Sequence, residues 1–388
     1  MRQKKMPSSM SKYLLSRIPF GFSKGLRNMR ILCKALGNPQ RNFESIHIAG
    51  TNGKGSTAFY LSSIFKGHGV SAGLFTSPHL VSVRERIRIN GKMISQSELD
   101  NVLLQVERAA KIAKIEPSYF ETLTAAAFLW FKKNNILVAV MEAGLGGRLD
   151  STRIASGNIA AITSIGLDHT EFLGNSEEKI LKEKLGIAKK NAILILGDLK
   201  QELLAKCPPH AKAKKINPPL QVGNFGKIYA KNAELAWTIA EEFLDATFNK
   251  DKARAALKNA AWPGRMQELK NFILDGAHNP DAAKVLAKCL KEKNIGPLPC
   301  IFASLTDKDT EGVLRELKPH ISVCHPVQIE NPRARSAEEI AEICKKLKIK
   351  TTNETFKNKA QVLVTGSLYL VGKVIAELCG EGVDFAEF

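Results

Sequence analysis

The chain alternates between short apolar runs and longer segments whose apolar residues recur about every three or four positions. An apolar run of about four to eight residues is typical of a buried strand, and the longer spacing is typical of a helix that buries one face. In the N-terminal part, buried strands are predicted at 46–49, 70–75, 136–141, 159–165 and 192–196. Helices are predicted there at 13–36, 98–115, 180–190 and 232–243, with others that begin near 58 and end near 134. This alternation predicts an α/β fold with a mostly parallel sheet.

The pattern pauses at 253–264, where Trp262, Pro263 and Gly264 predict a stiff turn, and then restarts. Strands are predicted at 272–274, 301–303, 321–324 and 362–364, with helices between them and a last helix at 367–378. A second alternation predicts a second parallel sheet, and a length of 388 residues favours two domains. We therefore predict an N-terminal domain at 1–258 and a smaller, Rossmann-like α/β domain at 259–388.

The first predicted strand runs into a glycine-rich turn and then into a helix; the turn reads Gly50-Thr51-Asn52-Gly53-Lys54-Gly55-Ser56-Thr57. Glycines let backbone N–H groups converge on phosphate oxygens, and the start of the helix adds partial positive charge. Lys54 adds a full charge, and Ser56 or Thr57 adds a hydroxyl for Mg²⁺. The spacing departs from the common pattern G-x-x-x-x-G-K-[ST], but the flanking strand and helix favour a nucleotide loop over a turn with a solvated lysine. The N-terminal domain is thus predicted to be an ATPase domain of the phosphate-loop type.

Polar residues follow three more of the predicted strands. The sequence 76–79 ends the second strand, Glu142 ends the strand at 136–141, and Asp168-His169-Thr170 follows the strand at 159–165. Open α/β sheets bind their ligands at this edge. Two interpretations of Glu142 are open: an ion pair with Arg148 that closes the turn, or a magnesium ligand, directly or through water.

Two local features complete the pattern. Arginines alternate with other residues at 84–88 before Asn90-Gly91, which predicts a hairpin with a basic face. That face is either a solvated edge strand or a row of arginines for an anionic substrate. Ser118 or Thr122 is predicted to cap the helix that ends near 134.

Composition narrows the class of protein. Lysine and arginine number 57 against 38 aspartates and glutamates, a net charge of +19, which suits nucleic acid, a membrane surface or polyanionic small substrates. The basic residues are nevertheless spread along the chain, without a stripe of interleaved aromatic residues. No apolar run is long enough to span a bilayer. The seven cysteines contain no C-x-x-C pair and favour free thiols in a reducing cytosol. The N-terminal segment, basic and without Asp or Glu, is similar to a transit peptide, whereas the apolar spacing after Ser11 favours packing on the body.

Nine segments, in this order, resemble the folylpolyglutamate synthase and dihydrofolate synthase family of the Mur ligase superfamily. They lie at 37–40, 49–56, 76–79, 142–150, 168–170, 183–187, 263–265, 275–280 and 366–372. The resemblance spans nearly the whole chain. It also explains the phosphate loop, because this superfamily uses the shorter form with the extra glycine.

The resemblance implies an ATP-dependent carboxylate–amine ligase. ATP phosphorylates a carboxyl group of dihydropteroate or of a folate, and the amine of L-glutamate then displaces the phosphate. Lys54, the loop amides and Mg²⁺ stabilise the charge of the transferred phosphoryl group. The implied partners are small molecules only, namely ATP, L-glutamate and dihydropteroate or folates, with neither nucleic acid nor membrane, and a cytoplasmic monomer is expected.

The same resemblance assigns roles to single residues. The implied catalytic residues are Lys54, His169 and Lys184. Lys184 matches a lysine that the family carboxylates to a carbamate, which is a ligand for a second metal ion. The implied metal ligands are Ser77, Glu142, His169 and Lys184. The implied contacts to ATP are Asn52, Gly53, Lys54, Gly55, Ser56, Thr57, Asn232, Arg265, Asp275 and His278. The pterin or folate side is matched by Phe120, Glu121, Gly146, Gly147 and Arg148.

Several alternatives stay open at this point. Dihydrofolate synthase and folylpolyglutamate synthase activities both fit, because the two use the same ATP site. Another amino-acid ligase of the superfamily, acting on a peptidoglycan precursor, is the nearest alternative. A basic, NTP-dependent protein that binds nucleic acid is an alternative of a different class.

Overall fold

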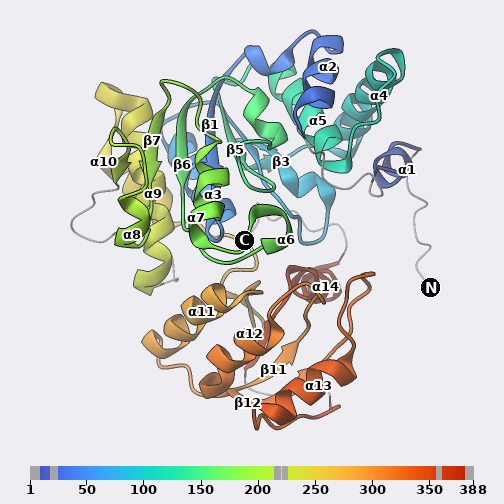
Figure 1. Ribbon diagram of the computed structural model, residues 1–388, viewed down its shortest axis with the longest axis vertical. Helices are drawn as coiled ribbons and strands as arrows, with labels where there is room; N and C mark the ends of the chain where they lie inside the picture. Colours follow the sequence, from blue (N-terminus) through green and yellow to red (C-terminus); the bar gives the residue numbers. More distant parts are fainter. Residues whose placement is uncertain (1–8, 18–24, 214–219, 221–225, 355–360, 381–388) are drawn as a thin grey trace. The chain divides into compact units, whose positions relative to one another are not determined.

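The computed structural model of this protein describes residues 9–17, 25–213, 220, 226–354 and 361–380 (Figure 1). These residues divide into two compact units. The first comprises the described residues of Met1–Ser77, Val83–Pro218 and Asn232–Leu257, and the second those of Pro78–Ser82, Pro219–Lys231 and Lys258–Phe388. After Ser77 the chain therefore packs with the second unit for a short stretch before it rejoins the first at Val83.

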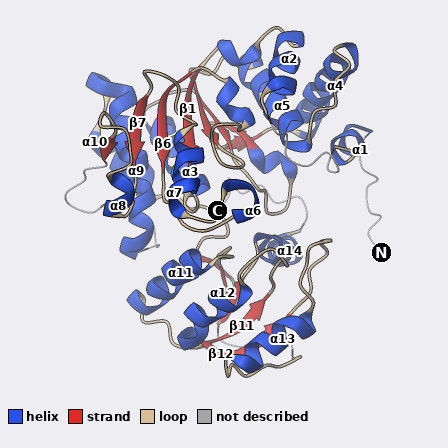
Figure 2. Cartoon of the chain, in the orientation of Figure 1, coloured by secondary structure: helices blue, strands red, loops and turns tan. Residues whose placement is uncertain are grey.

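Helices and strands alternate along most of the described chain (Figure 2). The α-helices are α1 (Ser9–Leu15), α2 (Arg27–Ala35), α3 (Lys54–Gly67), α4 (Gln96–Ile112), α5 (Tyr119–Lys133), α6 (Thr170–Leu173), α7 (Glu177–Leu185), α8 (Gln201–Leu204), α9 (Gly226–Leu244), α10 (Lys250–Lys258), α11 (Pro280–Glu292), α12 (Thr310–Leu317), α13 (Ala337–Lys346) and α14 (Leu368–Cys379). The strands are β1 (Glu44–Ala49), β2 (Ala72–Phe75), β3 (Ile87–Ile89), β4 (Lys92–Met93), β5 (Val138–Glu142), β6 (Gly157–Ile162), β7 (Ile193–Leu196), β8 (Lys212–Ala213), β9 (Gln267–Leu269), β10 (Phe272–Leu274), β11 (Leu298–Phe302), β12 (Ile321–Pro326) and β13 (Val362–Thr365).

The described strands of the first unit form one sheet in the order β4-β3-β2-β5-β1-β6-β7-β8. β1 lies between β5 and β6 and runs parallel to both, while the pairs β2–β3 and β3–β4 are antiparallel. Ile48 of β1 lies opposite Glu142 of β5, and Ala49 lies opposite Ile162 of β6. Because these strands end side by side, the turns that follow them meet at one edge of the sheet.

The described strands of the second unit form a smaller sheet in the order β12-β11-β13-β10-β9. All its neighbouring pairs are parallel except β10–β9. Its apolar core joins Leu274 and Val364 to the buried face of α14. The predicted fold class, a mostly parallel α/β sheet with a smaller second α/β sheet, is confirmed.

A capping box at Ser118 and Glu121 sets the first residue of helix α5. The Ser118 Oγ accepts the N–H of Glu121, and the Glu121 carboxylate accepts the N–H of Ser118 at 2.9 Å, which is a capping box. Of the two caps predicted, the structure selects Ser118. Behind this start, α5 packs with α2 and α4 into an apolar cluster of the first unit, which also contains Phe75 and Met141.

Two predictions about local structure need correction. The predicted lead-in helix at 13–36 is two helices, α1 and α2, separated by residues that include 18–24, outside the described residues. The predicted hairpin that begins with the arginines at 84–88 has its first strand only from Ile87, after a 3-10 helix at Val83–Arg86. The segment at 253–264, predicted as a junction, begins inside α10, and the first unit ends within it at Leu257.

The hairpin after this 3-10 helix exists, but its arginines are not a fully solvated face. Arg88 is only 3% exposed, and its Nε donates to Glu85 O at 3.1 Å. The Arg84 Nε donates to Ile94 O at 2.7 Å, and both Arg84 and Arg86 are half-buried. The interpretation as a solvated edge strand is therefore wrong for Arg88, and the row of arginines for an anionic substrate stays a prediction.

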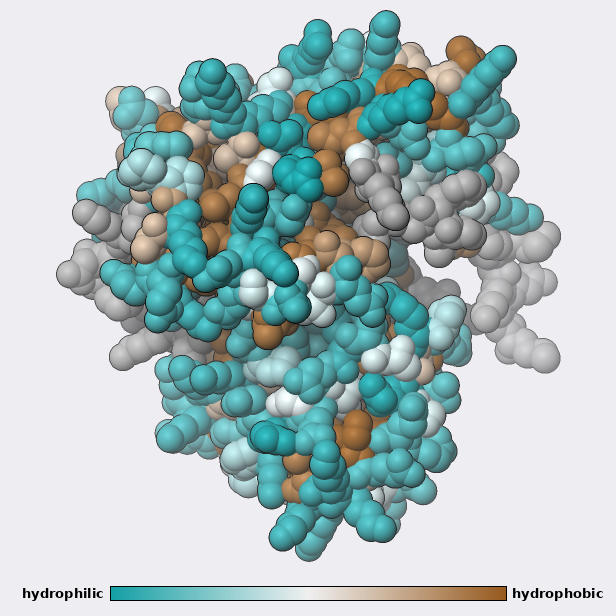
Figure 3. Space-filling model, viewed as in Figure 1, coloured by the Kyte–Doolittle hydropathy of each residue, from teal (hydrophilic) through white to brown (hydrophobic). Residues whose placement is uncertain are grey.

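The surface that Figure 3 shows is mainly hydrophilic, with apolar patches between the charged side chains. No helix in the described part of the chain has the length and apolar character that a bilayer span requires. Among the residues that the structure describes, Ile112, Leu167 and Phe172 are large apolar side chains that are exposed. Some exposed apolar residues are normal on a protein surface.

His47 on β1 is a buried histidine that the fold keeps neutral. Its side chain is 1% exposed, and its Nε2 lies 3.2 Å from Ser45 Oγ. Burial, together with the positive charges of Lys189 and Arg153, lowers its pKa to about 3. In the unfolded chain this histidine has the ordinary pKa of about 6.5. Between about pH 6.5 and pH 3, the unfolded chain is therefore protonated at His47 while the folded chain is not.

We expect this histidine to make the protein sensitive to acid. Because the folded pKa is depressed, the stability is fully present above about pH 6.5 and is lost as the pH falls toward 3. Between pH 6.5 and pH 5 the loss is about 2 kcal/mol in free energy of unfolding. Chemical denaturation of His47→Gln at both pH values should show a pH dependence smaller by this amount, whereas the exposed control His210→Gln should match the wild type. Equal pH dependence in all three proteins would contradict the assignment.

Candidate active site

The loop between β1 and α3 depends on two glycines. Gly53, which precedes α3, has φ +84°, a left-handed conformation that residues with a side chain rarely adopt. A methyl group on Gly50 would lie 1.8 Å from Thr163 Oγ1, and one on Gly53 would lie 2.3 Å from Asn232 Oδ1. Neither position has room for a side chain. The second contact also brings Asn232 of α9, one of the residues predicted to contact ATP, to the loop.

The residues immediately after β6 hold the loop in place, a role that was not predicted from the sequence. Thr163 Oγ1 donates to Asn52 O at 2.6 Å, and Ser164 Oγ accepts the N–H of Asn52 at 3.0 Å. The N–H of Thr51 donates to Ser164 O at 2.8 Å. The available signal was a polar Thr163-Ser164 pair after an otherwise apolar strand. Because the loop is anchored from behind, the first N–H groups of α3, which have no acceptor within their own helix, are left to bind an anion.

Two lysine amines meet at one carbonyl oxygen of this loop. Lys54 Nζ donates to Gly50 O at 3.0 Å and to Thr51 O at 3.1 Å. Lys184 Nζ, from α7, donates to the same Gly50 O at 2.7 Å. Lys184 is 5% exposed, and its burial together with the charge of Lys54 lowers its pKa to about 7. Lys54 therefore brings a positive charge to this carbonyl, beside a buried amine that loses its proton more easily than an ordinary lysine.

Glu142 lies at the end of β5, beside the turn that follows β2. Its Oε2 accepts the N–H of Ser77 at 2.8 Å, and its side chain is 3% exposed. The structure therefore brings two of the predicted metal ligands together at the sheet edge that carries the phosphate loop. Arg148 pairs with Glu183, with 3.0 Å between Nη2 and Oε1, so the alternative of a Glu142–Arg148 pair is wrong.

His169 lies in the turn after β6 and is the residue immediately before α6, with φ +50°. Its N–H donates to Asp168 Oδ1 at 2.9 Å, and its Nε2 lies 4.0 Å from Asp168 Oδ2. The charge of Asp168 also raises the pKa of Lys184, against the larger effect of burial. Asp168 thus interacts both with His169 and with Lys184. Its only signal in the sequence was its place in the Asp168-His169-Thr170 motif.

The residues present fit a magnesium ion that is bound together with phosphate. Within the described ranges, no three His, Cys, Asp or Glu side chains lie close enough to hold a metal ion by themselves. Mg²⁺ keeps several waters and is usually bound by one or two carboxylates together with substrate phosphates. Glu142 supplies one buried carboxylate beside Ser77, next to a loop shaped for phosphate. A metal site made of protein ligands alone does not fit.

The glycine-rich turn after β5 packs between Phe120 and the end of α7. A methyl group on Gly144 would lie 2.6 Å from the ring of Phe120, and one on Gly147 would lie 2.6 Å from Lys184 O. Gly146, between them, has φ +65°. The turn therefore contacts Phe120 at one end and the backbone of Lys184 at the other.

Other residues near this turn hold local structure. The Asp150 carboxylate accepts the N–H groups of Gly144 at 2.8 Å and Leu145 at 3.0 Å, and burial raises its pKa. Glu121 is buried in the capping box of α5, and Arg148 holds the turn to α7 through its ion pair. Contact of Glu121 and Arg148 with a substrate stays a prediction.

In the second unit, three residues predicted to contact ATP lie together: Arg265 precedes β9, and Asp275 and His278 follow β10. Asp275 is buried and accepts two backbone N–H groups at 2.9 Å each. Arg265 Nη1 donates to Gly264 O at 3.1 Å, and a methyl group on Gly276 would lie 2.5 Å from the same Nη1. His278 Nδ1 lies 2.8 Å from Gly276 O. The Asp275-Gly276-Ala277-His278 motif thus builds a compact polar turn around the Arg265 side chain.

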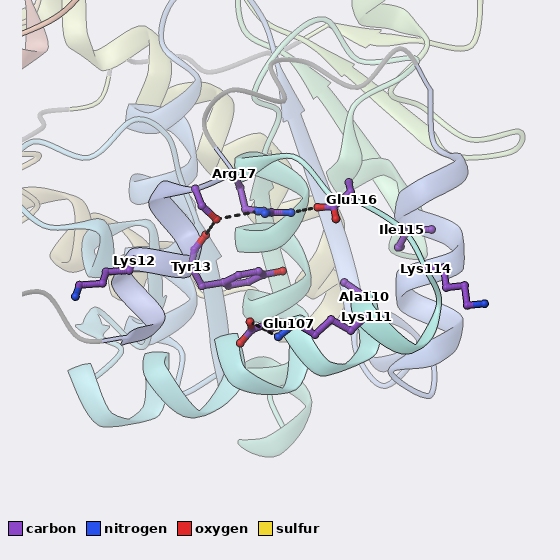
Figure 4. Close-up of a pocket in the computed structure, with 10 residues that line it drawn as sticks. Lys12, Tyr13, Arg17, Glu107, Ala110, Lys111, Lys114, Ile115 and Glu116 are labelled. Atoms are coloured by element: carbon purple, nitrogen blue, oxygen red, sulfur yellow. Dashed lines mark hydrogen bonds and ion pairs between the residues drawn. The ribbon is translucent and has the colours of Figure 1, made fainter.

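A separate cavity of about 760 Å³ lies beside α1 (Figure 4). It is lined by Lys12, Tyr13, Ser16, Arg17, Glu107, Ala110, Lys111, Lys114, Ile115 and Glu116. Arg17 pairs with Glu116 and lies over the ring of Tyr13. None of these residues belongs to the phosphate loop or to the strand ends, so this cavity is the seam where α1 meets α4 and is distinct from the nucleotide site.

Two family models match this chain. The Mur ligase middle domain matches residues 48–217, which contain the phosphate loop and the lysine pair. The Mur ligase glutamate ligase domain matches residues 264–371, which contain the polar turn of the second unit. The fold and the matched domains define the chain as a Mur ligase.

Individual relatives narrow this class. The chain is 30% identical over 416 residues to the dihydrofolate synthase/folylpolyglutamate synthase of Bacillus subtilis (strain 168), covering 93% of this chain and 96% of the relative. The structure of E. coli FolC in complex with DHPP and ADP is similar with a TM-score of 0.83 and 28% identity, covering 94% of this chain and 96% of that one. A bifunctional folylpolyglutamate synthase/dihydrofolate synthase with Mn, AMPPNP and L-glutamate bound has a TM-score of 0.83 and 29% identity, covering 95% and 98%. The chain belongs to the dihydrofolate synthase/folylpolyglutamate synthase family, as the sequence motifs predicted.

Proposed function

We propose that this chain joins L-glutamate to dihydropteroate, to a folate or to both, with ATP as the activating substrate. The observation that carries the proposal is the pair of amines, Lys54 and Lys184, on the Gly50 carbonyl of the phosphate loop. A carboxylate does not acylate an amine, because the leaving group would be oxide. Transfer of a phosphoryl group to the carboxylate replaces oxide by phosphate, and the charge of Lys54 on the loop favours that transfer. The Lys184 amine beside it has the separate role proposed below.

Structures of relatives support each class of substrate. E. coli FolC binds DHPP and ADP, and a related bifunctional enzyme binds AMPPNP and L-glutamate with Mn. The similarity extends over more than nine tenths of this chain in both cases. We therefore propose three classes of substrate for this chain: a nucleotide, L-glutamate and a pterin or folate.

Different residues of this chain are proposed to contact different parts of ATP. Lys54 and the first N–H groups of α3 hold the phosphates, because they combine a full charge with the partial charge of the helix start. Ser56 and Thr57 are both buried in the first turn of α3, and the hydroxyl of either would serve the Mg²⁺ that is bound with the phosphates. Asn52, Gly53, Gly55 and Asn232 form the loop and its immediate contacts. Arg265, Asp275 and His278 stay predicted contacts of the nucleotide.

We assign Ser77, Glu142 and His169 to the coordination of Mg²⁺. When bound, the ion supplies positive charge against the charge that develops on the transferred phosphoryl group. Glu142 holds the backbone of Ser77 through the N–H bond described above, so the two groups are oriented before any ion binds. Phe120, Gly146 and Gly147 are proposed for the pterin side, because the glycine-rich turn packs beside Phe120.

We further propose that Lys184 is carboxylated. A neutral amine attacks CO₂, the N–C bond forms, and one proton is released, which leaves an anionic carbamate. With a pKa of about 7, roughly half of the Lys184 amine is neutral at pH 7, whereas an ordinary lysine is almost fully protonated. The change also replaces the repulsion between Lys184 and Lys54 by attraction.

Activity should therefore depend on dissolved CO₂. In enzyme depleted of CO₂, bicarbonate should raise turnover, and the stimulation should grow as the pH rises through about 7, because only the neutral amine reacts. Labelled bicarbonate should give a carbamate carbon signal by NMR that Lys184→Met lacks. Lys182→Met, an exposed lysine on the same helix, should keep that signal. Activity insensitive to bicarbonate, together with an unmodified Lys184 amine, would remove this proposal.

Product analysis tests the function itself. The protein is incubated with Mg-ATP, L-glutamate and, separately, dihydropteroate, tetrahydrofolate or a UDP-muramoyl peptide. Release of ADP with a new amide on either of the first two supports the proposal and tells the two activities apart. A product from the UDP-muramoyl peptide alone would replace it by a peptidoglycan-precursor ligase.

The remaining expectations concern partners and compartment. We propose a cytoplasmic monomer that acts on small molecules, and the seven cysteines support a reducing compartment because all are free thiols in the structure. Filter binding against salt concentration tests the nucleic-acid alternative. Binding that vanishes by about physiological salt is non-specific, and only binding that persists would favour that class.

A further inference from the structure

A short segment next to the proposed metal site packs with the other unit. Pro78–Ser82, here called the strap, groups with the second unit, although Ser77 before it and Val83 after it group with the first. Within the strap, Leu80 and Val81 pack against the apolar core of the second unit. One peptide bond joins the strap to Ser77, whose N–H donates to the Glu142 carboxylate. The backbone of a proposed metal ligand therefore continues directly into this anchored segment.

Helix α14 receives the strap at Gly372. A methyl group on Gly372 would lie 2.0 Å from Leu80 O and 2.6 Å from Leu80 C. These are backbone atoms, which cannot turn aside as the end of a side chain can. Glycine inside a helix is otherwise unfavourable, and Gly372 has no positive φ that would demand it. The close approach of the strap is therefore the physical reason for glycine at this position, the last residue of the motif at 366–372.

The side chain of Leu80 lies at a second glycine. A methyl group on Gly264 would lie 3.3 Å from Leu80 Cδ1 and 3.2 Å from Val371 Cγ1. The carbonyl of Gly264 accepts a hydrogen bond from the guanidinium of Arg265. The strap is thus held between α14 and the turn that carries Arg265, by its backbone on one side and by its side chain on the other.

We propose that Leu80 and Gly372 are positioning residues for Ser77 and, through the Ser77 N–H, for the Glu142 carboxylate. The proposal rests on the proposed function, which assigns Ser77 and Glu142 to Mg²⁺. Ser77 lies three positions before Leu80, so a fixed Leu80 backbone restricts where the Ser77 N–H can point. Displacement of the strap from α14 weakens the bond that orients the carboxylate, and with it the affinity for the ion. Groups that orient metal ligands in this way typically contribute about 10–100-fold to metal affinity.

Gly372→Ala tests this role, because its methyl group must displace the Leu80 backbone. Electron paramagnetic resonance should show Mn²⁺ affinity, in the presence of a non-hydrolysable ATP analogue, reduced about tenfold. The Mg²⁺ concentration for half-maximal activity should rise by a similar factor, with turnover at saturating Mg²⁺ changed less than about twofold. A merely structural role would lower turnover without shifting the metal dependence.

Two further variants complete the test. Gly296→Ala adds a methyl group at an exposed glycine of the second unit with no atom within 4 Å, and should leave both metal measurements unchanged. Leu80→Ala removes the anchoring side chain without adding an atom, and should weaken Mn²⁺ binding in the same direction even if Gly372→Ala does not fold. Wild-type Mn²⁺ affinity in Leu80→Ala and in folded Gly372→Ala would overturn the positioning role. Because the Mn²⁺ measurement needs no folate, absence of ligation by the wild type would reject the proposed function separately.

Discussion

Lys54→Ala should abolish ligation and leave the protein folded. The Lys54 amine carries the full charge of the phosphate loop and lies 3.0 Å from Gly50 O. Its removal takes away a preorganised cation that stabilises the transferred phosphoryl group, a change that typically costs about 10³-fold or more in turnover. The side chain is only partly buried and lies outside the apolar core, so the thermal midpoint should change little. Coupled measurement of ADP release with each folate substrate gives the turnover.

The same variant has a second effect that a general loss of folding would not produce. The charge of Lys54 helps to lower the pKa of Lys184. In Lys54→Ala the pKa of Lys184 should therefore rise, and carbamate formation should move to higher pH. The matched control is Lys66→Ala, an exposed lysine near the end of the same helix, which should keep wild-type turnover. Normal turnover in a soluble Lys54→Ala protein would contradict the assignment of the loop.

Much of the fold was predictable because its central strands are buried on both faces. Such strands read as continuous apolar runs, so β5 was predicted at 136–141 and lies at Val138–Glu142. Short edge strands carry no such signal, and β8 and β9 have only a few residues each. The strap at Pro78–Ser82 was beyond prediction for another reason, since residue spacing describes local structure and not which unit a segment packs with.

The candidate site was predictable to the extent that it depends on strand ends. Glu142 and Ser77 were placed together because parallel strands end at one edge of a sheet. Lys184 came from family resemblance alone, since the charge run around it is typical of a solvated face, whereas the structure buries its amine against Gly50 O. Thr163 and Ser164 were missed because a side chain that anchors a loop from a neighbouring strand leaves no pattern in the loop itself.

Glu142→Gln should weaken the metal dependence of the enzyme more than its fold. Glutamine keeps the shape of the side chain, and its amide oxygen can still accept the N–H of Ser77, which now lies 2.8 Å from the carboxylate. What is lost is the negative charge, in a site where Mg²⁺ prefers anionic oxygen ligands. We expect the Mg²⁺ concentration for half-maximal activity to rise about 10–100-fold, with a matching loss of Mn²⁺ affinity measured without turnover.

Comparison with Glu142→Ala separates the charge from the hydrogen bond. Alanine removes both, so the Ser77 N–H loses its acceptor, and the additional cost is about 1–3 kcal/mol in free energy of unfolding if that group stays buried. Glu241→Gln, an exposed carboxylate on α9, is the control and should leave metal dependence and stability unchanged. If Glu142→Gln retained the wild-type Mg²⁺ dependence, the carboxylate would be a structural acceptor for Ser77 alone. The metal would then have to be held by phosphate and by the side chains after β2 and β6.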